Sequence, residues 1–167
     1  DEIAEHLNVS KGAFYYHIKN KEDLLIHCYD RSLDIMERIH AKAEAADCSG
    51  FEKAEMTCRQ TFHIQNSSDG PLVRYTSITA LPIDKRKPIL KRTDVGNALF
   101  ERFLKQGITD GSVRNINTFV AQQLITGAVN ASMDLKLWRK VDDLDAAAID
   151  YFDVFFNGLA PRNTAST

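Results

Sequence analysis

The apolar residues of this chain recur at helical spacing, and that periodicity constrains its fold more than any other feature. Between residues 21 and 46, one face of a helix is marked by Leu25, Cys28, Tyr29, Ser32, Met36, Ile39 and Ala43. Steps of three and four place side chains on one side of an α-helix, and no segment shows the period-two alternation of a half-buried strand. The sequence therefore predicts an all-α protein.

Capping and helix-breaking residues predict where the helices begin and end. Asn20 is a suitable N-cap for the long helix, and Gly107 is a suitable C-cap for a later one. Asp110 and Gly111 are typical of a turn. We expect helices over about 1–7, 11–18, 21–46, 51–65, 71–81, 88–106, 117–138 and 143–159, with residues 82–88 as a basic linker.

Composition limits the class of protein without naming its function. The 167 residues are 44% hydrophobic and 26% charged, which is ordinary for a globular protein, and no apolar run has the length of a membrane span. Three cysteines without CxxC spacing favour free thiols in a reducing cytoplasm, where we expect the protein to act. The net charge of −2 means that binding to nucleic acid requires a local basic surface.

The stretch VSKGAFYYHIKNKEDLL, from Val9 to Leu25, carries the clearest functional signal. On a helix, Phe14 and Ile18 share one face and can anchor it, while lysine, tyrosine and histidine side chains occupy the others. Two short helices joined by a tight turn, the second rich in hydrogen-bond donors, have the geometry of a helix-turn-helix that reads DNA.

This segment resembles the TetR family of bacterial transcriptional regulators. In that family a helix similar to EIAEHLNVS is followed by a recognition helix of the form SKGxxYYHF and then by KExLL. The matching residues here are Glu2 to Ala4, Val9 to Gly12, Tyr15 to His17, Lys21-Glu22 and Leu24-Leu25. The family's first helix normally precedes the position of Asp1, so we expect part of the DNA-binding module to lie upstream.

The resemblance implies roles for individual residues of the recognition segment. Lys11, Gly12 and Ala13 are expected to face base edges at the start of the recognition helix. The residues expected mainly to hold phosphates are Ser10, Tyr15, Tyr16, His17 and Lys21.

The resemblance also implies an architecture and a mechanism for the whole chain. Residues 1–46 are expected to form the incomplete DNA-binding domain with its connecting helix, residues 47–161 an effector-binding and dimerisation domain, and residues 162–167 a flexible tail. The protein is then a homodimer paired through its last two helices, most simply a repressor released from a palindromic operator by a small lipophilic or aromatic effector. No cofactor is expected. The candidate effector contacts are Phe62, His63, Tyr75, Phe100, Phe103 and Trp138.

Two other classes of function compete with this interpretation. Glu37 and His40 form an E-x-x-H, the spacing of di-iron carboxylate bundles, but the chain has no second copy of it. Nucleophile and nucleotide-binding fingerprints are also absent, so we expect neither an enzyme nor a metal site. The third class is a helical, dimeric interaction protein without DNA binding, against which only the Lys11-to-Lys21 pattern speaks.

Overall fold

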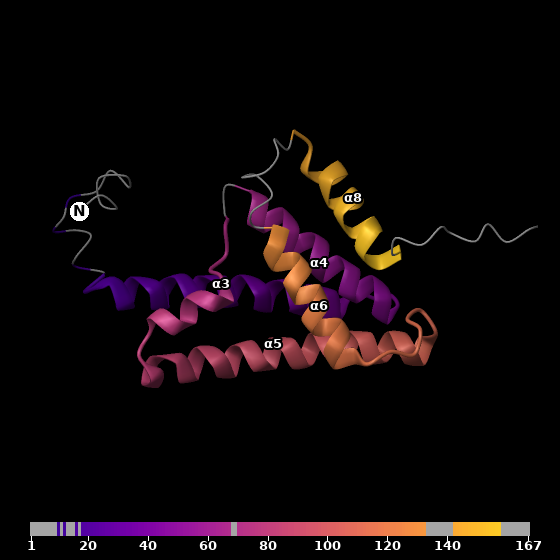
Figure 1. Ribbon diagram of the computed structural model, residues 1–167, viewed down its shortest axis with the longest axis horizontal. Coiled ribbons are helices and arrows are strands. Elements are labelled where there is room, and N and C mark those ends of the chain that lie inside the picture. The colour runs from indigo at the N-terminus through magenta and orange to yellow at the C-terminus, as the bar shows by residue number, and fades with distance from the viewer. Residues whose placement is uncertain are drawn as a thin grey trace, which may run out of the picture. The chain divides into compact units, whose positions relative to one another are not determined.

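The computed structural model describes residues 10, 12, 16, 18–67, 70–132 and 142–157, except for the side chain of Tyr75. Within these ranges the protein consists of five α-helices and one 3-10 helix, with no strand (Figure 1). The elements are α3 (Lys21–Ala45), α4 (Gly50–Asn66), η1 (Tyr75–Ala80), α5 (Ile83–Asp110), α6 (Thr118–Ala131) and α8 (Leu144–Asn157). This confirms the predicted all-α class.

The backbone packs into two compact units that do not follow chain order. The first holds the described residues up to Arg38 together with Leu72–Ala98, and the second holds Ile39–Pro71 and the described residues from Leu99 onward. Helices α3 and α5 therefore each contribute residues to both units. The functional division after residue 46 stays a prediction, because compact packing does not by itself assign DNA or effector binding.

The core of the first unit joins α3, η1 and α5. Its buried members are Tyr29, Ile78, Leu81 and Ile89. The hydroxyl of Tyr29 donates to the carbonyl of Arg74 at 3.0 Å, and the Ser32 hydroxyl accepts from the N–H of Val73 at 3.0 Å.

These two bonds correct the helix predicted over residues 71–81. The backbone is extended through Arg74, and only Tyr75–Ala80 is helical, as a 3-10 turn. Side chains of α3 thus bond to a carbonyl and an N–H of this segment and hold it extended before η1. Hydrogen bonds between residues this far apart in the chain cannot be predicted from the local sequence.

The linker predicted over residues 82–88 is wrong, because α5 already begins at Ile83 and contains Pro88. The N–H groups of Lys85 and Arg86 donate to the carbonyl of Pro82 at 3.0 and 3.2 Å, which forms the first turn. Pro88, the sixth residue of α5, has no N–H to donate to the carbonyl of Asp84, so one bond of the helical ladder is missing near this start. The guanidinium of Arg86 also donates to the carbonyls of Leu81 and Thr79, at 2.7 and 2.9 Å, and ties the end of η1 to α5.

In the second unit, α4 packs against both α6 and α8 (Figure 1). The buried core gathers residues from α3, α4, α5, α6 and α8: Ala43, Ala54, Cys58, Phe62, Phe100, Phe103, Leu104, Ile125, Ala148 and Phe152. Phe62 and Phe152 meet edge to face with ring centroids 5.8 Å apart, a favoured aromatic arrangement. The hydroxyl of Tyr151 on α8 donates to the carbonyl of Ala128 on α6.

Two glycines allow α4 and α5 to approach closely. A Cβ on Gly50 would lie 2.1 Å from the nitrogen of Gly107 and 2.3 Å from the carbonyl oxygen of Phe103, so no other residue fits there without a backbone shift. The predicted C-cap at Gly107 is therefore wrong: this glycine serves packing, and α5 continues to Asp110. Gly111, with φ of 81°, makes the turn that was predicted after the helix.

The start of α4 is held at this crossing by polar groups. Ser49 caps the helix in a reciprocal box with Glu52, and the N–H of Gly50 donates to Asp110 Oδ2 at 2.8 Å. Hydrogen bonds from Ser112 and from the N–H of Gly50 hold the pKa of Asp110 below its usual value. The carboxylate is thus kept ionised at the end of α4 where the helix dipole favours negative charge.

Substitution of Gly50 tests the close approach. Gly50→Ala is expected to lower the free energy of unfolding by on the order of 3 kcal/mol, because the new methyl group meets backbone atoms. Gly107→Ala is the matched control with a smaller expected loss, since its nearest neighbour is the tip of the Val113 side chain, at 2.4 Å. Urea unfolding of both variants measures the difference. Equal losses, or a larger loss for Gly107→Ala, would contradict this packing.

Candidate nucleic-acid interface and effector region

The junction that leads into α3 is fixed by two short hydrogen bonds. The N–H of Asp23 donates to Asn20 Oδ1 at 2.8 Å, and the N–H of Lys19 donates to Asp23 Oδ2 at 3.0 Å. This confirms the capping predicted for Asn20 and sets the direction in which the preceding segment leaves the helix. Whatever orients α3 therefore also orients residues 19 and 20.

Four of the eight predicted DNA-binding residues lie among the described residues. Ser10, Gly12, Tyr16 and Lys21 are all exposed, and Tyr16 is 83% exposed. A Cβ on Gly12 would have no atom within 4 Å, so nothing within the described part of the protein requires glycine there. The other four predicted contacts, Lys11, Ala13, Tyr15 and His17, lie outside the described residues.

Three of the six predicted effector contacts come together in the core of the second unit. Phe62, Phe100 and Phe103 are exposed by 0%, 7% and 2%, and all belong to one cluster. His63 is half-buried beside them, with Nε2 at 3.2 Å from Asp145 Oδ1 on α8. Tyr75 begins η1 in the first unit, where its side chain is not described, and Trp138 lies outside the described residues.

A buried polar row on α4 was not predicted from the sequence. Thr57, Thr61 and Gln65 follow at steps of four and are exposed by 3%, 4% and 7%. The hydroxyls of Thr57 and Thr61 donate to the carbonyls of Lys53 and Thr57, one turn earlier in the same helix, at 2.9 and 2.8 Å. The four-residue spacing was the available signal, although it did not distinguish a buried polar row from an exposed one.

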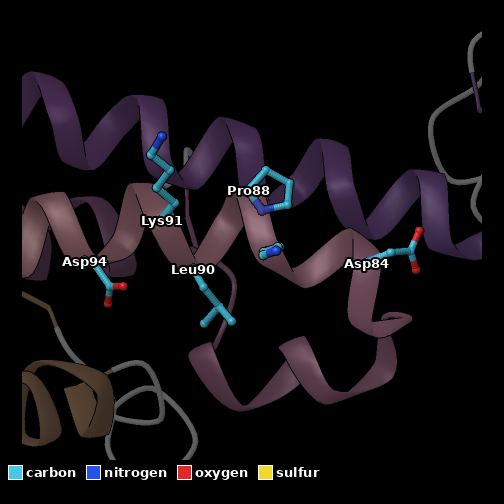
Figure 2. A pocket seen from close by; sticks show the side chains of 6 residues that line it. Asp84, Pro88, Leu90, Lys91 and Asp94 are labelled. Atoms are coloured by element: carbon cyan, nitrogen blue, oxygen red, sulfur yellow. The ribbon is translucent and has the colours of Figure 1, made fainter.

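A shallow hollow of about 570 Å³ lies on α5 in the first unit. Figure 2 shows Leu90 and Asp94 leaving the helix on one side and Lys91 on the other. Its lining residues are Asp84, Lys87, Pro88, Leu90, Lys91 and Asp94. All but Leu90 are exposed, and none of them is a predicted effector contact. The mixed charges of this open surface are typical of a solvated helix face.

Glu37 and His40, the two residues of the E-x-x-H, do not have the surroundings of metal ligands. The carboxylate of Glu37 accepts from Arg92 Nε at 2.9 Å, and His40 is buried. Among the described residues, no group of three or more histidine, cysteine, aspartate or glutamate side chains is placed to hold a metal ion. Burial raises the pKa of the Cys58 thiol to about 12, which keeps it protonated and unreactive.

None of the described helices combines the length and the apolar character needed to cross a membrane.

Comparisons with known proteins bear on the start of the chain and on its fold. Residues 1–28 match the sequence profile of the family described as bacterial regulatory proteins, tetR family. The fold is similar to the crystal structure of the TetR family regulator PfmR from Thermus thermophilus, with a TM-score of 0.75 and 19% identity over 95% of this chain and 87% of that one.

Two further solved structures share the fold and carry ligands. FadR from Bacillus subtilis, in complex with stearoyl-CoA, has a TM-score of 0.66 and 20% identity over 95% of this chain and 87% of FadR. AibR, in complex with isovaleryl coenzyme A and operator DNA, has a TM-score of 0.72 and 20% identity over 95% of this chain and 86% of AibR. The chain thus matches the tetR family profile over its first 28 residues, and its fold is similar to that of solved TetR family regulators.

Proposed function

We propose that this protein is a transcriptional regulator of the TetR family, a homodimeric repressor that binds a palindromic operator in the cytoplasm and is released from it by an acyl-CoA effector. One observation carries the proposal: all eight predicted DNA contacts, from Ser10 to Lys21, lie within the 28 residues that match the family profile. The fold of the remaining chain supports the effector and the dimer.

In this proposal Lys11, Gly12 and Ala13 read base edges, and the other predicted contacts hold phosphates. The open space around Gly12 supports close approach of its backbone to DNA, since none of the described residues packs against that position. Tyr16 and Lys21 are both exposed, and a hydroxyl and an ammonium group are suited to hydrogen bonds with phosphate oxygens.

The proposed dimer contact uses the outward face of the last two described helices. Phe119 and Leu124 on α6 are 61% and 63% exposed, and Ile149 and Val154 on α8 are 55% and 51% exposed. Large apolar side chains that are this exposed on helices of one unit favour a protein partner. Phe152 on α8 is 1% exposed in the core and takes no part in the proposed contact.

The proposed effector is the thioester of coenzyme A with a fatty or branched short-chain acid. The aromatic cluster of Phe62, Phe100 and Phe103 supplies an apolar environment for an acyl chain, and His63 at its edge supplies a polar group. FadR and AibR, which share the fold, are bound to stearoyl-CoA and isovaleryl coenzyme A. Tyr75 and Trp138 remain proposed contacts.

The proposed mechanism is a shift between two conformations. The effector binds best to a state in which α3 has moved and the two recognition segments of the dimer no longer match the spacing of successive major grooves, ~34 Å apart. Operator DNA favours the other state. Derepression then follows from the difference in the effector's affinity for the two states, without any covalent step.

Substitutions in the recognition segment test the proposed DNA contacts. Tyr16→Ala and Lys21→Ala are expected to weaken binding to every DNA sequence and to lower the slope of affinity against salt by about one for each lost phosphate contact. Lys11→Ala is expected also to relax sequence preference. Fluorescence anisotropy with operator and random duplexes, over a series of salt concentrations, measures both effects.

Lys42→Ala is the matched control, because Lys42 is an exposed lysine in the last turn of the same helix, α3. It is expected to bind like the wild type. Wild-type affinity and salt dependence in all three test variants would overturn the assignment of the interface.

The dimer contact is tested by Leu124→Glu, which places a charge in the proposed apolar interface. Sedimentation velocity is expected to show a monomer, because burying an unpaired carboxylate is unfavourable. Val95→Glu is the control: Val95 is 65% exposed, as Leu124 is 63%, but it lies on α5 in the first unit. A dimer in both variants would rule out this interface.

A further inference from the structure

One arginine of the first unit holds three carboxylates at once. From α5, Arg92 donates through Nη1 to Asp30 at 3.2 Å, through Nη2 to Asp34 at 2.6 Å and through Nε to Glu37 at 2.9 Å. The three acidic residues are spaced by four and three along α3, so they lie on one face of that helix. Every nitrogen of the guanidinium is thus engaged with a different residue of one neighbouring helix.

The chemistry of this contact is specific to arginine. A guanidinium presents five N–H groups in a rigid planar fork, whereas a lysine ammonium is a compact charge on a flexible chain and does not define the same orientation. Hydrogen bonds with Glu37 and then Asp34 raise the pKa of Arg92, so the cation is retained. The carboxylate side chains are 54–58% exposed, however, so water and salt screen the attraction. Arg92 therefore contributes more to the orientation of α3 against α5 than to the free energy of unfolding.

The acidic face also depends on this cation. Like charges four residues apart on a helix repel one another, as Asp30 and Asp34 do. Among the described residues, Arg92 forms an ion pair with each of the three carboxylates, those of Asp30, Asp34 and Glu37. Without it, three carboxylates would line the side of α3 that faces α5.

Hydrogen bonds along the first half of α3 connect the Arg92 contact with the junction that precedes this helix. Asn20 and Asp23 fix the direction of the chain at Lys19, as described above. Tyr29 and Ser32 fasten the same half of α3 to the extended segment before η1. Arg92 adds the link to α5, and the first half of α3 is thereby held from two sides within its own unit.

We propose that Arg92 is a positioning residue for operator recognition: it fixes α3 against α5 and so orients the recognition segment that leads into Lys21. This inference rests on the proposed function, because it concerns how well the two recognition segments of a dimer match two half-sites. Arg92 itself touches neither the DNA nor the effector in this proposal.

Specific and non-specific DNA binding respond differently to such a change. An operator requires both recognition segments at a fixed separation, whereas random duplex needs only phosphate contacts. Loss of the Arg92 contact is therefore expected to lower operator affinity and to leave affinity for random duplex unchanged. A loss of folded protein would lower the affinities for operator and for random duplex by the same factor. The ratio of the two affinities therefore distinguishes a positioning role from an effect on stability.

The experiment compares wild type, Arg92→Met, Arg92→Lys and Arg102→Met. Arg102 is the matched control because it lies on α5 and pairs with a single carboxylate of α3, that of Glu44. Arg92→Met is expected to lower the ratio of operator to random-duplex affinity about tenfold, a modest part of the usual specificity ratio. Arg92→Lys is expected to fall between Arg92→Met and wild type, and Arg102→Met to remain within about twofold of wild type. Amide hydrogen exchange over residues 30–38 is expected to accelerate in Arg92→Met alone.

Each outcome decides one of the two claims. An unchanged affinity ratio in Arg92→Met, with wild type binding the operator, would overturn the positioning role and leave the proposed function standing. Equal losses on operator and random duplex would also overturn it, since they indicate unfolding. A wild-type protein with no preference for the DNA upstream of its own gene would overturn the proposed function together with the positioning role.

Discussion

The continuity of α3 and α5 is the constraint on which the rest of this structure depends. Each helix contributes residues to both compact units, so neither unit has a complete core without a segment of the same two helices. On α3, Tyr29 is buried in the first core and Ala43 in the second. Along α3 and α5 the chain passes from one unit to the other without leaving the helix. In the proposed mechanism, repacking around the aromatic core acts on the same helices that orient the recognition segment.

Much of the fold was predictable because local rules agree with tertiary packing along most of the chain. The long helix α3 begins after its predicted cap, Asn20, and ends at Ala45 rather than Ala46. The wrong predictions share one cause, which is that a distant partner overrides a local signal. Gly107 resembles a helix end but meets Gly50 across a helix crossing, and the segment before η1 bonds to Tyr29 and Ser32 instead of forming a helix.

The candidate site shows the same division between local and distant information. The recognition segment was visible in sequence because its residues are consecutive, and the family match over residues 1–28 agrees with it. Arg92 was not visible, since its three partners lie 55 to 62 residues away in a helix whose acidic face resembles any solvated surface. The apolar stripe of the last helix does not say which partner covers each residue: Phe152 is buried in the core, whereas Ile149 and Val154 are exposed.

Coupling between the two binding activities is the central claim, and its most direct test is a linkage measurement. The affinity of the protein for stearoyl-CoA and for isovaleryl-CoA is measured by calorimetry, with and without saturating operator duplex. Thermodynamic reciprocity predicts that the operator weakens binding of the active acyl-CoA by the same factor by which that acyl-CoA weakens binding of the operator. An acyl-CoA affinity that is unchanged by saturating operator would contradict the account.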